Sequence, residues 1–254
     1  MTPDNCALIL PSSVYSAARL TVLLDPEERA RQYIDALSWY IRETTIKKII
    51  VCDNTGYSYP STLQQLAAAH DKKLELLSFS GNSAAVEKYG KGYGEGEIME
   101  YTMAHSVLLR EAEGFIKVTG RLKVVNINKI VQRIDAAENY FMPISLLRPR
   151  FLVPRAARPC VEVRVYYVTK PFFNEVLLTA YQTVRDDETF FLEHAYHQAI
   201  ARSPGFIKKV KCFPVAPEIT GMSGSNGWIF KERSWPKKML IKLVSHLGYV
   251  RPIW

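Results

Sequence analysis

The sequence lacks the cysteine patterns of a disulfide framework or a zinc site. Its four cysteines (Cys6, Cys52, Cys160 and Cys212) are far apart, with no Cys-x-x-Cys pair and no histidine at ligand spacing. Cys6 and Cys52 lie inside apolar runs, where a free thiol behaves as a small buried hydrophobe. This usage is typical of a reducing compartment and predicts no zinc site.

The chain also has no long apolar run, and its first residues predict no secretory leader. No run approaches the roughly 18 residues that a membrane-spanning helix needs. The start, MTPDNCALILPSS, has neither a basic segment nor a full apolar core. We therefore expect a cytoplasmic protein whose membrane contact, if any, is peripheral to the inner face of the membrane.

The composition is that of a globular, basic chain. It has 254 residues, of which 48% are hydrophobic and 23% charged, so one well-buried domain is expected. The formal net charge of +8 favours a polyanionic partner: nucleic acid, an anionic membrane surface or a phosphorylated ligand. The alternative is a basic protein whose charge serves solubility alone.

Strand and helix patterns alternate through the first 130 residues. Apolar runs predict strands over 6–11, 47–56, 73–79 and 114–127, and amphipathic patterns predict helices over 25–43, 60–70, 95–112 and 128–139. This alternation predicts a single α/β, Rossmann-type domain with a mainly parallel sheet flanked by helices. Ligands of such sheets bind beyond the carboxyl ends of the strands.

The second half is less regular. It predicts a strand over 161–168, helices over 170–184 and 186–201, a strand over 206–215 and a loop over 221–227. An arginine-rich, proline-rich connector covers 146–159. Asp186 is best explained as part of an acidic N-cap cluster at a helix start.

Asp53 and Asn54 follow the second predicted strand. An acid there can accept hydrogen bonds from a ribose or a base. The alternative is an Asx turn, which the stretch Asp-Asn-Thr-Gly favours by itself.

The stretch KYGKGYGEGEIMEY (88–101) is rich in glycine and leads into a predicted helix. We expect a loop whose backbone N–H groups face an anion, with Lys91, Gly92, Tyr93 and Gly94 on the ligand. Glu95 or Glu97 would repel a phosphate at the helix start, so one of them should face a sugar hydroxyl. The alternative is a mobile surface loop.

The stretch FIKVTGR places two cations around a turn at a strand end. Lys117 and Arg121 bracket Thr119 and Gly120. Because a lysine in a buried strand needs a partner, a diphosphate is a candidate, and arginine binds one with bidentate geometry. The alternative is an ion pair with a carboxylate such as Glu113.

Two further groups of polar residues lie in the second half. Glu162 and Arg164 share one face of a strand, and Glu193 and His197 share one face of a helix. Glu193 is our first candidate for a general base, and Glu95 the second. His197 is more simply explained by packing.

Four stretches together resemble a group of bacterial and viral surface-polysaccharide glycosyltransferases with a GT-A-like fold. They are ERARQYIDALSWYIRETTIKKIIVCDNTGY, GKGYGEGEIMEYTMAHS, FIKVTGRLKVVNI and EVRVYYVTKPFFNEVL with VRDDETFFLEHAYHQAI. The later GMSGSNGWIF is similar to that group's closing loop. The resemblance implies a nucleotide-sugar donor and a glycan or lipid-linked acceptor for lipopolysaccharide, capsule or a related coat.

The resemblance also implies roles for the site residues. Asp53 and Asn54 would lie by the nucleoside, Gly92 to Glu95 by the sugar phosphate, and Lys117 to Arg121 at the centre of the donor site. Residues 1–130 would form the donor half and 131–230 the acceptor half, with Glu162, Arg164, His197 and Ser223 on the acceptor.

The chain departs from the wider class in one motif. No strand of the first half ends in the Asp-x-Asp that holds a divalent metal on a nucleotide diphosphate. Metal dependence therefore stays open, and Lys117 and Arg121 could neutralise the leaving group instead. Two other classes stay open as well: a nucleotidyltransferase or methyltransferase on a related sheet, and a nucleic-acid-binding protein without catalysis.

The end of the chain predicts a basic amphipathic helix. Residues 231–254 carry six Lys or Arg and one Glu, and the apolar face consists of Met239, Leu240, Leu243, Val244 and Leu247. Trp235, Tyr249 and Trp254 are residue types that favour a membrane interface. We expect residues 236–247 to lie on an anionic surface, and the alternative is that they pack on the protein's own core.

We predict that the full-length chain sediments with anionic vesicles at low salt and that deletion of 235–254 abolishes this. Each base near an anionic leaflet contributes about 1 kcal/mol, so the tether is weak and salt-sensitive. Neutral vesicles are the control. If the full-length protein ignores anionic vesicles at low salt, the apolar face belongs to the fold.

Overall fold

The computed structural model describes residues 2, 4–16, 18, 23, 25–142, 160–222, 229 and 230. The arginine-rich connector, Ser223 with most of its loop, and the basic tail lie outside the described residues. Within the described part of the chain, no helix is both long and apolar enough to cross a membrane.

The first half alternates strands and helices as expected. Its elements are β1 (Cys6–Ser12), α1 (Pro26–Glu43), β2 (Lys48–Asp53), α2 (Thr62–Ala69), β3 (Lys73–Ser78), α3 (Ser83–Tyr89), α4 (Lys91–His105), α5 (Val107–Arg110), β4 (Gly114–Val118), β5 (Lys123–Val124) and α6 (Ile127–Val131). The second half contains β6 (Asn139–Met142), β7 (Glu162–Thr169), α7 (Lys170–Phe172), α8 (Leu192–Ala201), α9 (Pro204–Ile207), β8 (Val210–Cys212), β9 (Ile219–Met222) and β10 (Ile229–Phe230).

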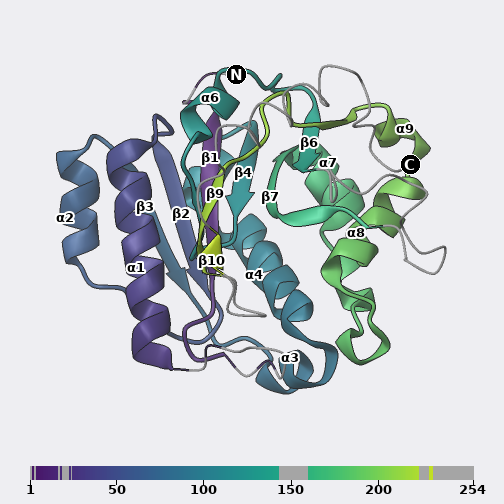
Figure 1. The fold of residues 1–254 in the computed structure, drawn as a ribbon, viewed down its shortest axis with the longest axis horizontal. Coiled ribbons are helices and arrows are strands. Elements are labelled where there is room, and N and C mark those ends of the chain that lie inside the picture. The colour runs from purple at the N-terminus through teal and green to yellow at the C-terminus, as the bar shows by residue number, and fades with distance from the viewer. Residues whose placement is uncertain are drawn as a thin grey trace.

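The main sheet has seven strands in the order β3-β2-β1-β4-β7-β6-β8 (Figure 1). β1 pairs in parallel with β2 and β4, and β2 pairs in parallel with β3. β7 runs antiparallel to both of its neighbours, β4 and β6. β5, β9 and β10 form a separate small sheet. The predicted α/β class with a mainly parallel sheet is confirmed.

Both faces of the sheet are covered by apolar packing. Along β1, Leu8 and Leu10 point into the cluster that contains Leu37 and Tyr40 of α1. The alternate residues Ala7 and Ile9 point into the opposite cluster, with Met99 of α4 and Ala195 of α8. A strand buried on both faces reads as a continuous apolar run, which is why CALIL could be recognised as a central strand.

The helix α1 forms where its caps and apolar stripe predict it. The side chain of Asp25 accepts from the Glu27 N–H, and Pro26 occupies the first turn. Its buried face includes Tyr33, Leu37 and Tyr40, at helical spacing.

The glycine-rich stretch is helical, so the predicted loop at this place is wrong. Gly90, with φ at +105°, is the residue between α3 and α4, and α4 begins at Lys91. Gly92, Gly94 and Gly96 are buried within α4. A β-carbon on Gly96 would lie 2.0 Å from Cγ of Tyr181. The glycines therefore let α4 pack closely against its neighbours, and this tertiary packing outweighs their poor helix propensity.

Irregular structure replaces two of the expected helices. The predicted helix over 170–184 is the short α7 followed by a π-helical turn at Phe173–Leu177 and a 3₁₀ turn at Ala180–Thr183. The predicted helix over 128–139 is only the short α6, which ends at Val131, and Asn139 begins β6, a strand that the sequence pattern did not reveal. This short strand forms because it pairs with β7 and β8, which lie far from it in the sequence.

We predict that Gly96→Ala lowers the free energy of unfolding by about 1–3 kcal/mol, because the added methyl group overpacks the contact with Tyr181. Urea denaturation measures the change. The matched control is Gly205→Ala, because nothing lies within 4 Å of a β-carbon placed there. Equal stability of the two variants would contradict the packing role of the α4 glycines.

Candidate functional site

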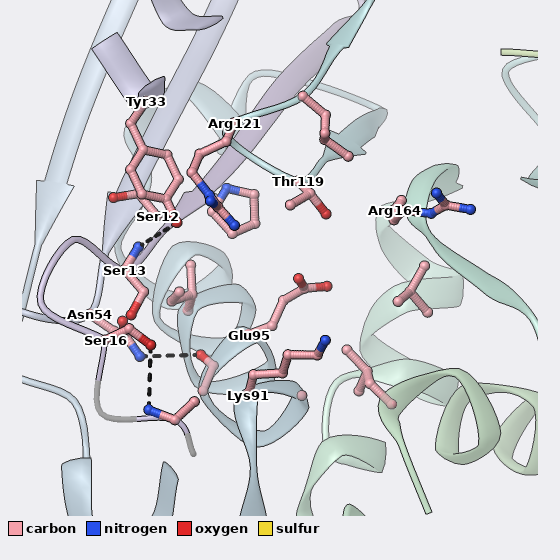
Figure 2. Close-up of a pocket in the computed structure, with 18 of the residues that line it drawn as sticks. Ser12, Ser13, Ser16, Tyr33, Asn54, Lys91, Glu95, Thr119, Arg121 and Arg164 are labelled. Carbon is pink, nitrogen blue, oxygen red and sulfur yellow. Dashed lines mark hydrogen bonds between the residues drawn. The ribbon is translucent and has the colours of Figure 1, made fainter. Parts of the chain in front are cut away.

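A cavity of about 560 Å³ opens at the carboxyl ends of the parallel strands. Residues after β1, β2 and β4 meet there with the first turns of α1 and α4 and with the start of β7 (Figure 2). Its polar lining residues are Ser12, Ser13, Ser16, Arg29, Tyr33, Asn54, Lys91, Glu95, Thr119, Arg121, Glu162, Arg164 and Glu193. This is the edge at which open α/β sheets bind ligands.

Two buried arginines form one end of the cavity. Arg29 and Arg121 are only 3% and 8% exposed, and the Arg121 guanidinium carbon lies 5.6 Å from the centre of the Tyr33 ring. Across the described ranges, neither guanidinium has a carboxylate within ion-pair distance. Burial lowers the pKa of Arg29 and the charge of Arg121 lowers it further, whereas Tyr33 and the carboxylate of Asp53 act in the opposite direction. An anion placed here would relieve both effects.

The partners of the two arginines are neutral. Arg29 donates from Nε to the carbonyls of Ser13 and Val14, each at 3.0 Å. Arg121 donates from Nη1 to Oε1 of Gln32 at 3.3 Å. The Nε of Arg121 is buried and has no hydrogen-bond partner in the described structure. The pair is thus well anchored but not neutralised.

Arg29 and Tyr33 were missed by the sequence reasoning, although a signal was present. They fall on the buried face of α1 together with Leu37 and Tyr40. An arginine on the apolar face of an amphipathic helix is rarely buried without a functional or structural partner. Ser12, Ser13 and Ser16 were missed too, and they carry no motif that would reveal them.

Asp53 does not reach the cavity, so the predicted contact with a nucleoside is wrong. It is fully buried, and its carboxylate accepts from the hydroxyl of Ser12, from Val14 N at 3.1 Å, from Thr55 N at 2.7 Å and from Tyr57 N at 3.2 Å. The Asx-turn alternative describes what the side chain does: it ties together the chain segments that leave β1 and β2.

Asn54 does line the cavity. Its amide nitrogen lies 3.5 Å from the carbonyl oxygen of Gly94, and its Oδ1 is buried without a partner in the described part of the chain. The side chain therefore bridges the end of β2 and the helix α4, and it retains a polar atom that a ligand could satisfy.

The residues predicted in the glycine-rich stretch divide between the cavity and the core. Lys91, Gly92 and Gly94 line the cavity. Tyr93 does not, because its ring packs against Tyr89 and Tyr181, 5.4 Å and 5.0 Å away.

The two glutamates of this stretch also separate. Glu97 accepts from the backbone N–H of Asn82, so it supports α3 and faces no ligand. Glu95 lines the cavity.

Lys117 is completely buried beneath Glu95, and it is not among the cavity-lining residues. Its ammonium donates to Oε1 of Glu95, to the carbonyl of Val163 at 2.8 Å and to Oγ1 of Thr119 at 3.4 Å. The ion-pair alternative is therefore the one observed, with Glu95 as the partner in place of the expected Glu113. The predicted contact between Lys117 and a diphosphate is not supported.

Thr119 and Gly120 form the turn between β4 and Arg121. Thr119 lines the cavity, and its N–H donates to the carbonyl of Arg164 at 2.9 Å. Gly120 packs underneath, where a β-carbon would lie 2.4 Å from the carbonyl oxygen of Pro11. The absence of a side chain at Gly120 thus allows the turn to hold Arg121 close to the end of β1.

Carboxylates gather at the other end of the cavity. Glu162 pairs with Arg164, whose Nε lies 2.8 Å from Oε1 of Glu162. Glu193, from the first turn of α8, lines the same region. Burial raises the pKa of Glu193, the charges of Glu162 and Glu95 raise it further, and Lys91 acts in the opposite direction. A carboxylate of raised pKa in a cleft is a suitable general base.

His197 lies in a second groove, so its predicted place beside Glu193 is wrong. The groove is lined by one face of α8 and by residues 183–190, with Arg185, His194, Gln198 and Arg202 among its members. Successive turns of α8 thus present Glu193 to the main cavity and His197 to another surface. Ser223 lies outside the described residues.

Within the ranges that the structure describes, no three or more His, Cys, Asp or Glu side chains gather so that they could hold a metal ion. Of the cavity carboxylates, Glu95 is paired with Lys117 and Glu162 with Arg164.

Comparison with known proteins assigns the chain to no family. No family model matches it, and no curated protein matches it. Among solved structures, mannosyltransferase PcManGT from Pyrobaculum calidifontis, in complex with GDP-Man and Mn2+, is 14% identical with a TM-score of 0.42, over 68% of this chain and 47% of that one. This chain thus spans under half the length of that protein.

Two further solved structures have similar scores. A cytidylyltransferase from Leptospira borgpetersenii is 8% identical with a TM-score of 0.44, over 97% of this chain and 88% of that one. Core-mannan synthase A from Aspergillus fumigatus is 11% identical with a TM-score of 0.42, over 97% and 85%. At these values the likeness transfers no activity to this chain.

We predict that Glu193→Gln stabilises the protein above neutral pH. A carboxyl whose pKa is raised by folding opposes folding once it ionises, so its contribution is most favourable at low pH and is lost as pH rises through the folded-state pKa. The melting temperature of the variant should exceed that of the wild type at pH 8.

The advantage of Glu193→Gln should vanish below about pH 4, where the carboxyl is protonated in the folded and the unfolded states. Glu43→Gln, at an exposed position of α1, is the control and should change nothing at either pH. A variant less stable than wild type at pH 8 would contradict the burial of an ionisable Glu193.

Proposed function

We propose that this chain is a glycosyltransferase that moves a sugar from a nucleoside diphosphate to a hydroxyl acceptor. The observation that carries the proposal is the pair of buried arginines, Arg29 and Arg121, at the carboxyl edge of the parallel strands without an ion-pair partner in the described structure. Two buried, adjacent cations repel each other, and an anion bound between them would offset that repulsion. A diphosphate has the charge and the oxygen geometry for this.

The two ends of the cavity match the two halves of such a donor. Arg121, with its unpartnered Nε, would hold the diphosphate. Asn54 and the serines that follow β1 would face the nucleoside, since they line the same end. Lys91, Glu95, Glu162, Arg164 and Glu193 would surround the sugar and the acceptor.

Glu193 is the proposed base of an inverting transfer. It takes the proton of the acceptor hydroxyl, whose oxygen then forms a bond to the anomeric carbon of the sugar. The bond between that carbon and the diphosphate oxygen breaks, and its electron pair leaves with the nucleoside diphosphate. Arg121 stabilises the negative charge that develops on the leaving group. Because Glu95 is bound to Lys117, it is the second candidate for the base.

The acceptor and the setting are proposed from the sequence resemblance. Surface-polysaccharide enzymes build lipopolysaccharide or capsule, so the acceptor would be a glycan or a lipid-linked glycan and the activity that of a hexosyltransferase. The basic segment 231–254 would bring the enzyme to the inner face of the membrane by peripheral contact.

Thermal-shift measurements with UDP, GDP and CMP test the proposal. A ligand that binds only the folded state raises the melting temperature, and we expect one of these nucleotides to do so. A shift with S-adenosylmethionine or a nucleoside triphosphate alone would favour a methyltransferase or nucleotidyltransferase. A response to oligonucleotides alone would favour a nucleic-acid-binding protein.

We predict that Arg121→Ala weakens binding of the responding nucleotide by roughly 10- to 100-fold, the effect of losing a charged hydrogen bond. Turnover should fall by about two to three powers of ten, because the donor to the leaving group is lost. Isothermal titration and a donor-hydrolysis assay measure these changes. Arg42→Ala, an exposed arginine of α1, is the control. Near-native binding and turnover in Arg121→Ala would show that this arginine does not contact the diphosphate.

A further inference from the structure

Lys117 is a charged side chain in the core of the domain, and it has no exposed surface. It lies on β4 in the middle of the main sheet, where its Nζ is 5.6 Å from the centre of the Tyr166 ring. A buried ammonium is costly unless its donors are all used. Here the three protons have three acceptors: Glu95, Val163 and Thr119.

These contacts fix Glu95 in turn. Lys117 holds its Oε1 from inside the protein, and the Glu95 side chain keeps 22% of its surface exposed, on the cavity side (Figure 2). α4 itself packs closely against α3 and α8, because Gly92 and Gly94 have no side chain at these two contacts. Glu95 is therefore a preorganised carboxylate, and a carboxylate accepts hydrogen bonds but donates none.

The charges of the cavity separate into two groups. Arg29 and Arg121 both lie at the Tyr33 ring, with guanidinium carbons 5.9 Å and 5.6 Å from its centre. Glu162 and Glu95 lie near Glu193, whose pKa is raised first by burial and then by their charges. The arginine end is thus positive, and a diphosphate would neutralise it. The other end has three carboxylates (Glu95, Glu162 and Glu193), balanced by Lys91, Lys117 and Arg164, and is neutral overall.

We infer that Glu95, positioned by Lys117, selects an uncharged sugar with a free hydroxyl, and that this end of the cavity rejects an acidic sugar. The inference rests on the proposed function and narrows its donor class to neutral hexoses. A hydroxyl can donate to the fixed oxygen of Glu95. The carboxylate of a uronic acid would instead be repelled by Glu95, Glu162 and Glu193. Lys117 and Arg164 already form ion pairs with Glu95 and Glu162, and Lys91 is shared among the carboxylates.

Lys117 acts here through Glu95, so it is a positioning residue. Without the ammonium, Glu95 would be free to turn toward solvent, and the hydroxyl would lose a preformed acceptor. The diphosphate contact would persist, because in the described structure no hydrogen bond or ion pair joins Lys117 to Arg29 or Arg121.

The test compares dissociation constants of UDP, UDP-glucose and UDP-glucuronic acid by isothermal titration, with GDP and GDP-mannose for a guanine-specific protein. In the wild type, the neutral hexose should tighten binding about tenfold over the diphosphate alone, as a hydrogen bond to a charged group does. The uronic acid should bind no tighter than the diphosphate.

Glu95→Gln and Lys117→Met should each abolish the tenfold gain from the hexose and leave the diphosphate affinity unchanged. Glu95→Gln should also weaken the discrimination against the uronic acid, because one of the three carboxylates is lost. The double variant should be no worse than either single variant, because both remove one interaction. It also avoids the unpaired buried charge that Glu95→Gln leaves on Lys117, so it serves where either single variant does not fold. Glu43→Gln is the control.

Each other outcome overturns a defined statement. If UDP or GDP binds but Glu95→Gln and the double variant keep the gain from the hexose, the inference is wrong and the proposed function stands. The same holds if the uronic acid binds the wild type as tightly as the hexose. If no nucleoside diphosphate binds at all, the proposed function fails and the inference with it.

Discussion

The buried carboxylate of Asp53 is the contact on which the cavity depends. It lies at the end of β2 and accepts from Ser12 and Val14 after β1 and from Thr55 and Tyr57 after β2. The chain after β1 is therefore held with its carbonyls toward α1, where Arg29 donates to Ser13 and Val14. One carboxylate thus shapes the wall that carries the positive end of the site.

A second constraint is the close packing of α4. Its glycines bring the helix against α3, α8 and the turn at Tyr181, so the side chain of Glu95 reaches Lys117 in the sheet. Larger residues would move the helix outward and separate this ion pair. Glycine is a poor helix former, but in α4 the close approach of neighbouring elements outweighs the loss of helix propensity. The same packing places both Lys91 and Glu193 in the lining of one cavity.

The division of charge gives the site its direction. Arg29 and Arg121 form a positive end beside the strands, and paired carboxylates and cations form a neutral end beside α8 and β7. A ligand with a charged and an uncharged half can bind in one orientation only. Glu193, with its raised pKa, lies in the neutral end, where the proposed transfer would need a base.

The sequence by itself determined the alternating strands and helices, the parallel arrangement and the edge of the sheet that holds the site. These follow from local periodicity, from caps such as Asp25 and from the rule that parallel strands end on one side. It also singled out Arg121, Asn54, Glu162 and Glu193 as candidate site residues, and the structure shows that all four line one cavity. Only the tertiary structure decided that Asp53 and Lys117 turn inward, that the glycine-rich stretch is a helix and that His197 leaves the site. Each of these features depends on which residues the side chain or helix packs against, and those residues are distant in the sequence.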